Sequence, residues 1–294
     1  MFRHLRMILP ENARSFLRDI RTALLSVGLP VKRDFPQPLC EIEASHDMSV
    51  VVPICDAPAV VWGCLASLDK YAPRAEVILV DDHSELDQTR NLIAEFSERN
   101  HWKTIRLDSR VGHSRSCEAG ARLATRPYLC LLNSDTIVTP WSWRGSQEAF
   151  EADPRIGVTG PSTSYTATVQ TVSRAEYCRH YWNDSQVFAF AQSYIDGQPA
   201  QCWTDLPEVG GFAFFVRRRA WDELRGFDSN LPDYGNEFEF CRRASKQGWR
   251  VVWTANSYIH HLGHQSYSSV LGRRGIVAKG LLSDAYIKRK HFLR

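Results

Sequence analysis

The sequence predicts an α/β fold with a Rossmann-like, mostly parallel central sheet and helices on both faces. Two observations carry this prediction: β-branched apolar runs alternate with segments of helical periodicity, and acidic or amide residues follow several of those runs. Right-handed crossovers would place the carboxyl ends of such strands along one rim of the sheet. With 294 residues, 44% of them hydrophobic, the chain can bury a sizeable core.

The predicted elements follow one another regularly. Apolar, β-branched runs with the composition of buried strands occupy residues 48–54, 76–80, 103–108 and 127–132. Segments with apolar residues at helical spacing occupy residues 59–71, 86–96 and 114–124. Strands and helices that alternate at this length form βαβ units, which favour a parallel sheet.

Polar residues stand where the predicted strands end. Asp56 follows the first strand, Asp81 and Asp82 end the second, and Asn133 and Asp135 follow the fourth in LCLLNSDTIV. Turns and helix caps can explain any one of these residues, but a group of carboxylates on one rim needs a cation or hydrogen-bond donors. Because open α/β sheets bind ligands at this rim, we expect a metal or phosphate site there.

Composition excludes some classes of protein. The net charge of +3, without a basic-aromatic repeat, gives no support for nucleic-acid binding. The eight cysteines are scattered and form no Cys-x-x-Cys pair, which suits free thiols in a reducing compartment. No stretch is long and apolar enough to span a bilayer, and the N-terminus lacks a signal-peptide pattern, so we expect a cytoplasmic protein.

Residues 1–47 form a separate segment, an N-terminal extension followed by a Pro-containing linker. Its first part carries arginines at helical spacing, namely Arg14, Arg18 and Arg21. A separate apolar stripe consists of Leu17, Ile20, Leu24 and Val27. A basic amphipathic helix of this kind can lie on the inner face of a membrane as a peripheral contact. Packing of the apolar stripe on the main domain is an equal alternative.

The expected ligand is not a dinucleotide. The first strand is followed by PICDAPAVV, which has no glycine where a Rossmann phosphate loop needs close backbone approach. No GxxxxGK[ST] motif occurs either. Phosphates bound at this rim would therefore need a metal, and Mg²⁺ in proteins uses one or two carboxylates plus substrate phosphates. Asp135 fits that role.

Several segments in order resemble the family 2 glycosyltransferases of the GT-A fold, in their rhamnosyltransferase-like bacterial branch. The resemblance covers residues 48–265 and rests on VVVPICDAP, EVILVDDHS, RVGHSRSCEAGARLATRPYLCLLNSDT, GGFAFFVRRRAWDELRGFD and GNEFEFCRRASKQGWRVVWTANSYIHH. It implies an inverting, metal-dependent transfer of a hexosyl or deoxyhexosyl group from a UDP-, dTDP- or GDP-sugar. The implied acceptor is a saccharide or lipid-linked saccharide of bacterial polysaccharide synthesis at the cytoplasmic membrane face.

The resemblance also implies where the donor binds. The nucleobase and ribose would rest on the segment after the first strand, and Asp82 would contact the base. Asn133 stands at the first acid of the family's DXD motif, and Arg115 is either a diphosphate contact or a surface arginine. The residues implied for donor binding are Pro53, Ile54, Asp56, Asp82, Arg115, Asn133 and Ser134.

For the divalent cation, Mn²⁺ or Mg²⁺, the implied ligands are Asp135 and His261. His260 is the rival ligand, and on a strand the two histidines point to opposite faces, so only one should reach the site. The implied catalytic base is Glu237, with Glu239 as the alternative; the family's Glu-Asp pair is here Asn236-Glu237. An acid in the first turn of a helix is also stabilised by the helix dipole, which is the structural alternative for Glu237.

The remaining predictions concern the organisation of the chain. We expect a nucleotide-sugar-binding half at residues 48–170, an acceptor-binding and catalytic half at 171–265 and a helical tail at 266–294. Gly210 and Gly211 are predicted either to let an acceptor approach the backbone or, equally, to mark a β-bulge. Two alternative functions stay open: a sugar nucleotidyltransferase, although the glycine-rich loop it needs is absent, and an inactive carbohydrate-binding or scaffold subunit.

Residues 171–205 form an aromatic-rich insertion, whose side chains either stack on sugar rings or belong to the core.

Overall fold

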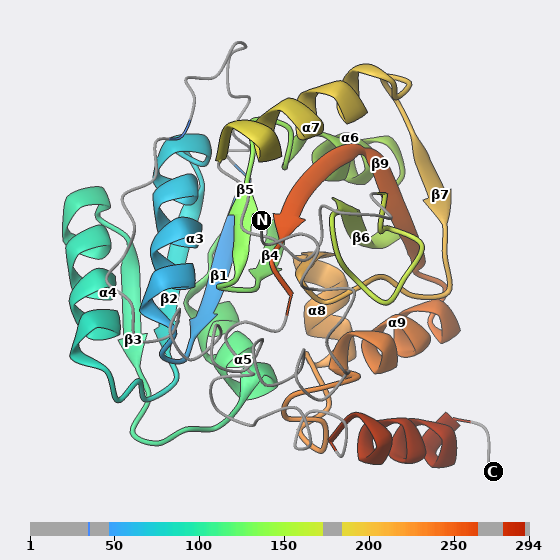
Figure 1. Ribbon diagram of the computed structural model, residues 1–294. Helices are drawn as coiled ribbons and strands as arrows, with labels where there is room; N and C mark the ends of the chain where they lie inside the picture. The colour runs from blue at the N-terminus through green and yellow to red at the C-terminus, as the bar shows by residue number, and fades with distance from the viewer. Residues whose placement is uncertain (1–34, 36–46, 173–183, 264–278, 292–294) are drawn as a thin grey trace, which may run out of the picture.

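The computed structural model describes residues 35, 47–172, 184–263 and 279–291 (Figure 1). Its first half has the expected alternation of strands and helices. The elements of this half are β1 (Met48–Ile54), α3 (Pro58–Tyr71), β2 (Glu76–Asp81), α4 (Asp87–Asn100), β3 (Lys103–Arg106), α5 (His113–Leu123) and β4 (Tyr128–Leu132).

The second half is less regular, because short strands and helices follow one another without a fixed alternation. Its elements are β5 (Thr136–Val138), α6 (Arg144–Ala152), β6 (Ile156–Thr163), α7 (Asp184–Asp196), β7 (Trp203–Asp205), β8 (Ala213–Arg217), α8 (Arg218–Leu224), α9 (Asn236–Lys246) and β9 (Arg250–His261). Residues 279–291 form a further helix at the C-terminal side, within the predicted helical tail.

In the described part of the chain, nine strands form one sheet in the order β3-β2-β1-β4-β8-β6-β9-β5, with β7 paired to β9. The pairs among β3, β2, β1 and β4 are all parallel, as the sequence predicts. β8 runs antiparallel to both β4 and β6, and β5 and β7 run antiparallel to β9. The second half of the sheet is therefore mixed, because no βαβ crossover fixes the direction of β8 relative to β4.

Helices cover both faces of this sheet, which confirms the predicted α/β architecture (Figure 1). Alternate residues of β1 show the division, since Val50 and Val52 pack with the apolar sides of α3, α4 and α6, whereas Val51 packs with α5, α8 and α9. Gly120 of α5 lies so close to β1 that an added Cβ would be 2.3 Å from Val51 Cγ1. The small residue thus lets α5 pack directly on the sheet.

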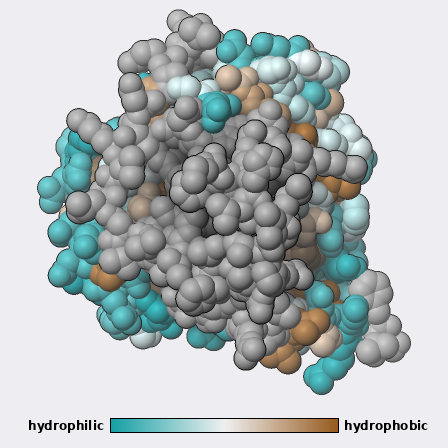
Figure 2. All heavy atoms as spheres, in the orientation of Figure 1, coloured by the Kyte–Doolittle hydropathy of each residue, from teal (hydrophilic) through white to brown (hydrophobic). Residues whose placement is uncertain are grey.

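The outer side of α4 illustrates how sequence periodicity places a helix. Leu92, Ile93 and Phe96 are buried toward the sheet, whereas Ala94 and Glu95 between them are exposed. Figure 2 shows this side of the molecule, at the left, as mostly hydrophilic. None of the helices in the described ranges is long and apolar enough to cross a membrane.

Some expectations concern segments outside the described residues. The amphipathic helix predicted within residues 1–33 is one of them. Of residues 1–47, Phe35 and Asp47 are described, and Phe35 packs on Tyr71 and Phe188. Cys40 and Cys178 also fall outside. The other six cysteines are free thiols, four of them buried, as expected for a reducing compartment.

Candidate functional site

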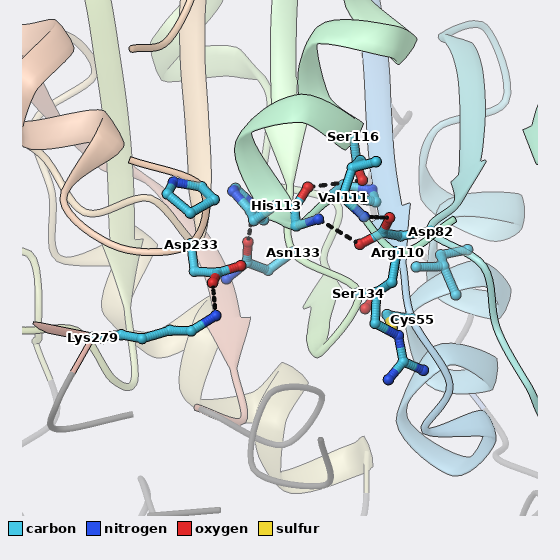
Figure 3. Close-up of a pocket in the computed structure, with 14 residues that line it drawn as sticks. Cys55, Asp82, Arg110, Val111, His113, Ser116, Asn133, Ser134, Asp233 and Lys279 are labelled. Carbon is cyan, nitrogen blue, oxygen red and sulfur yellow. Dashed lines mark hydrogen bonds and ion pairs between the residues drawn. The ribbon is translucent and has the colours of Figure 1, made fainter. Parts of the chain in front are cut away.

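A cavity of about 280 Å³ opens where β1, β2 and β4 end, at the rim that the sequence predicts (Figure 3). Parallel strands with this topology present their carboxyl ends to the same crevice. Residues of the predicted donor site that line the cavity are Pro53, Ile54, Asp82, Asn133 and Ser134.

Other lining residues, to which the sequence assigns no role in donor binding, follow β1, precede or begin α5, precede α9 or begin the C-terminal helix. They include Cys55, Arg110, His113, Asp233 and Lys279. Lys279 begins the C-terminal helix and donates a hydrogen bond to Asp233, so this lysine forms part of the cavity wall (Figure 3). Nothing in the local sequence around residue 279 indicates this placement, because it depends on the packing of the tail.

Asp56 is engaged in holding a neighbouring loop. Its Oδ1 accepts hydrogen bonds from the backbone N–H groups of Glu85 at 2.8 Å and Leu86 at 2.9 Å, and its Oδ2 pairs with Arg110 at 2.8 Å. It does not line the cavity. Its carboxylate charge is therefore compensated by protein donors rather than by a ligand.

Asp82 and Asp81 are also compensated by protein donors. The two carboxylate oxygens of Asp82 accept the backbone N–H groups of Val111 at 2.7 Å and Gly112 at 3.0 Å, which fixes the loop that leads into α5. Asp81 forms an ion pair with Arg106. Asp135, the remaining acid of the group predicted at the rim, lies beside His261.

Asp135 and His261 lie side by side. His261 Nε2 is 3.3 Å from Asp135 Oδ1, and both side chains are buried. Backbone pairing produces this contact, because β5 and β9 place Thr136 opposite His261 and the Leu262 N–H donates to the Asp135 carbonyl at 2.9 Å. His260, the residue before His261, points elsewhere, with its Nδ1 3.2 Å from the Tyr258 hydroxyl.

The imidazole of His261 is held in one orientation and one tautomer. Its Nδ1 lies 2.7 Å from the Tyr165 carbonyl oxygen, which can only accept, so Nδ1 carries the proton and donates it. Nε2 faces the Asp135 carboxylate, and in the neutral imidazole this nitrogen bears the lone pair that could bind a cation shared with Asp135. Burial acts to lower the pKa of His261, but the Asp135 carboxylate and the Tyr165 carbonyl outweigh it, so the pKa lies above its ordinary value.

The segment before β8 supports both the histidine and the predicted base. The Phe212 ring stacks on His261 with centroids 5.3 Å apart, and its carbonyl accepts the Asn133 N–H at 2.9 Å. At Gly211, an added Cβ would lie 2.9 Å from Glu237 Oε1, so the missing side chain makes room for that carboxyl group. The sequence predicts neither of these roles: it assigns none to Phe212, and at Gly211 it predicts an acceptor contact or a bulge.

Glu237 is a partly buried carboxyl group at the first turn of α9. Burial raises its pKa to about 7, with a further upward contribution from Glu208, although the N–H groups of Glu237 and Gly211 act in the opposite direction. A carboxyl group with a pKa near neutrality is well matched to accept a proton from a hydroxyl group.

Glu239 has a different environment, although it lies on the same helix. It is fully buried and pairs with Arg243 at 2.8 Å, Lys290 at 2.7 Å and His291 Nε2 at 3.2 Å. These contacts tie α9 to the C-terminal helix. The structure therefore favours Glu237 over Glu239 as the residue that can exchange a proton.

Other predicted site residues are not brought to the cavity. Arg115 is exposed on α5 and does not line it. Gly210 is buried against Thr166, and its N–H donates to Gln170 Oε1 at 2.7 Å, which is a structural role. Asp135, His261 and Glu237 lie beyond the cavity lining, which ends at Asn133 and Ser134 on this side.

The aromatic insertion is in part a core element. Phe188 of α7 is buried, with its ring 5.1 Å from that of Tyr71. Phe190 and Tyr194 stack on each other and contact Tyr258. Tyr181 and Trp182 lie outside the described residues. The hypothesis that aromatic side chains of this insertion stack on sugar rings therefore stays a prediction.

The amino-acid sequence matches one family model and is similar to two named proteins. The model of the family described as Glycosyl transferase family 2 matches residues 49–224, more than half of the chain. The O-antigen biosynthesis protein RfbC of Myxococcus xanthus is 24% identical over 236 residues, which cover 77% of this chain and 18% of that protein. A poly-beta-1,6-N-acetyl-D-glucosamine synthase of Staphylococcus epidermidis is 28% identical over 109 residues, 35% of this chain and 26% of the synthase. The chain thus matches a minor part of the length of both relatives.

Solved structures share the fold. The structure of GalNAc-T7 with UDP, GalNAc and Mn²⁺ superposes with a TM-score of 0.64 at 17% identity, covering 96% of this chain and 57% of that one. The mannosyltransferase PcManGT from Pyrobaculum calidifontis, in complex with GDP-Man and Mn²⁺, superposes with a TM-score of 0.54 at 14% identity, covering 93% and 77%. These likenesses establish a GT-A architecture. Together with the match to the family over most of the central sheet, they lead to one conclusion: the chain belongs to glycosyltransferase family 2.

Proposed function

We propose that this glycosyltransferase is metal-dependent and inverting, and that it moves a sugar from a nucleoside-diphosphate sugar to a saccharide or lipid-linked saccharide acceptor. The observation that carries the proposal is the Asp135–His261 pair, which lies directly after the cavity residues Asn133 and Ser134. A cavity for the nucleoside thus adjoins a carboxylate and an imidazole nitrogen that can share a cation.

The residues fit a divalent cation. His261 Nε2 is buried without a well-formed hydrogen bond, and its 3.3 Å distance to Asp135 Oδ1 is close to the ~3 Å that separates adjacent ligands of an octahedral ion. No group of three or more His, Cys, Asp or Glu side chains suited to a metal occurs among the described residues. Asp135 and His261 would therefore hold the ion together with diphosphate oxygens and water, as is usual for Mg²⁺.

Such an ion, Mn²⁺ or Mg²⁺, would supply positive charge to stabilise the departing diphosphate. The chain's own part is to hold the donor in the cavity and to remove a proton from the acceptor. Glu237, as a carboxylate, accepts the proton of the attacking hydroxyl while the acceptor oxygen bonds to the anomeric carbon and the bond to the diphosphate breaks. Attack from the face opposite the leaving group inverts the configuration.

The identity of the donor and acceptor rests on the relatives and neighbours. The solved neighbours are named as complexes with UDP or with GDP-Man, which supports a nucleotide-sugar donor with UDP or GDP as the carrier. The third carrier, dTDP, is proposed from the family resemblance. The relatives are named for O-antigen biosynthesis and for a poly-N-acetylglucosamine synthase, which supports a bacterial polysaccharide acceptor. Such an acceptor fits a cytoplasmic enzyme that contacts the membrane face peripherally through residues 1–33.

A thermal-shift panel tests this function. UDP, GDP, dTDP and CMP are each added with and without Mn²⁺, and we expect one nucleoside diphosphate to raise the melting temperature in a Mn²⁺-dependent way. Asp135→Ala should abolish the metal-dependent part. Hydrolysis of the matching nucleotide sugar without acceptor separates an enzyme from an inert binding subunit. Full metal-dependent stabilisation in Asp135→Ala would refute the site.

A further inference from the structure

We propose that His113 is a positioning residue for the transfer reaction, acting as an uncharged bridge between the donor-side Asn133 and Asn236, the residue before the base. This role rests on the proposed function, because it concerns the geometry between donor and base. The bridge spans three elements that are distant in sequence: the end of β4, the first residue of α5 and the first residue of α9.

Both contacts of His113 are within hydrogen-bond distance and lie in a largely enclosed part of the structure. His113 Nε2 lies 3.1 Å from Asn133 Oδ1, and His113 Nδ1 lies 3.3 Å from Asn236 Nδ2. Asn236 is 1% exposed, and the Cys117 thiol packs against the imidazole from the next turn of α5, 3.7 Å from Nε2. Figure 3 shows His113 and Asn133 joined in the cavity wall. The side chain thus belongs to the cavity and to the start of α9 at the same time.

The direction of each hydrogen bond follows from the chemistry of the groups. An amide nitrogen can only donate, so His113 Nδ1 must accept from Asn236 and Nε2 must carry the proton that it donates to the Asn133 oxygen. Only the neutral Nε2–H tautomer satisfies both partners. Burial lowers the pKa of His113, although Asn133 and the nearby carboxylates oppose the shift, and this favours the same neutral form.

Asparagine is the residue that this bridge requires at its α9 end. A carboxylate at position 236 could only accept, so it would face the Nδ1 lone pair and break the bond unless the imidazole became charged. A carboxylate at position 133 would add negative charge next to Asp82, Asp135 and Asp233. The two amides therefore connect the donor and base sides without adding charge to an already acidic rim.

The bridge sets the relative position of two functional groups. Asn133 lies two residues before Asp135, and Asn236 directly precedes Glu237. A shift at either end moves the donor site relative to the base, and a misplacement of about 1 Å can reduce the rate of a reaction about a hundredfold. His113 touches neither reacting atom in this account, so its effect is on alignment.

Two substitutions separate the two ends of the bridge. An asparagine at 113 can reach the Nδ1 position, so His113→Asn can keep the contact to Asn236 and lose the contact to Asn133. A glutamine can reach the Nε2 position, so His113→Gln can keep Asn133 and lose Asn236. We expect His113→Asn to raise the donor KM about tenfold with a smaller change in kcat. We expect His113→Gln to lower kcat tenfold or more, with the donor KM nearly unchanged.

The matched control is His83→Asn, because His83 also lies on the rim and makes one hydrogen bond, to the Leu107 carbonyl, without lining the cavity. Asn133→Ala and Asn236→Ala should reproduce the profiles of His113→Asn and His113→Gln, respectively, which keeps the test valid if a His113 variant does not fold. Equal changes of KM and kcat in both His113 variants, or profiles like that of His83→Asn, would overturn the bridge.

A measurement that needs no activity distinguishes failure of the bridge from failure of the proposed function. In the ¹⁵N spectrum of histidine-labelled wild-type protein at pH 7, assigned by the signal lost in His113→Gln, we expect His113 as the neutral Nε2–H tautomer. A charged or Nδ1–H imidazole would refute the bridge. Absence of nucleotide-sugar hydrolysis and transfer in the wild-type chain, with that tautomer present, would instead refute the function.

Discussion

The substitution Glu237→Gln is expected to abolish transfer and to stabilise the protein at alkaline pH. Burial raises the pKa of Glu237 from 4.5 to about 7. Between these two values the unfolded state releases its proton while the folded state keeps it, so stability is fully present below about pH 4.5 and is lost as the pH rises through about 7. This interval of about 2.5 pH units, at about 1.36 kcal/mol each, corresponds to about 3 kcal/mol as an upper bound for a partly exposed group.

Glutamine has nearly the same shape and carries no charge, so the variant should lack this pH-dependent loss. Urea unfolding at pH 4.5 and pH 8 measures the effect, because the difference in unfolding free energy between variant and wild type should grow toward about 3 kcal/mol at pH 8. In the same variant, donor binding should persist while acceptor-dependent transfer is lost. In the wild type, kcat should rise about tenfold per pH unit below pH 7 and level off above it.

Glu239→Gln is the matched control, on the same helix two residues away. Because Glu239 is ion-paired with Arg243 and Lys290, its loss should destabilise the protein by about 2 kcal/mol, with the opposite sign to Glu237→Gln. If Glu237→Gln is destabilising at pH 8, or if it retains transfer, then Glu237 is a structural carboxylate and its assignment as the base is wrong.

Three further substitutions test the support of the site. Gly211→Ala should displace Glu237 and lower kcat about a hundredfold with donor binding unchanged, since the new Cβ would lie 2.9 Å from its carboxyl group; an unchanged kcat in steady-state assays would contradict this. Phe212→Leu should weaken Mn²⁺ binding at least tenfold in calorimetry, because the ring that stacks on His261 is lost; equal affinity would exclude that role. Lys279→Gln removes a positive charge from the cavity wall, so it should weaken binding of a nucleoside diphosphate about fivefold and leave binding of the free nucleoside unchanged. Equal losses of affinity for both ligands would indicate that Lys279 has a packing role.

Much of the fold could be predicted from the sequence, because the alternation of apolar runs and helical periods in residues 48–132 fixes the parallel half of the sheet. The rim with its polar residues follows from the same regularity. The mixed second half could not be predicted in this way, since β8 and β9 pair with strands distant in sequence. No local pattern encodes which strand they join or in which direction.

The candidate site could likewise be predicted from the sequence only in part. The acidic rim and the placement of Glu237 at a helix start follow from local sequence, and the resemblance to the family implies Asp135 and His261 as partners. The roles of Asp56 and Asp82 as anchors for loops could not be predicted, because their backbone donors come from separate segments. His113 was missed for the same reason: its partner Asn236 lies 123 positions away.

The contact between Glu239 and the C-terminal helix is the clearest case of a tertiary effect. Two glutamates separated by one residue are equivalent by sequence, and each could be a base. Lys290 and His291 distinguish them, since they bury and neutralise Glu239 but leave Glu237 with a raised pKa. The distinction depends on the packing of a segment more than 40 positions downstream, which periodicity and composition do not describe.

The central claim, that Asp135 and His261 hold the cation, is tested most directly by pulsed electron paramagnetic resonance of the Mn²⁺ complex with the stabilising nucleoside diphosphate. We predict a ¹⁴N coupling from a directly bound imidazole in the wild type, its loss in His261→Asn and its retention in His260→Asn. A wild-type spectrum without nitrogen coupling, or a coupling that survives His261→Asn, would contradict the account.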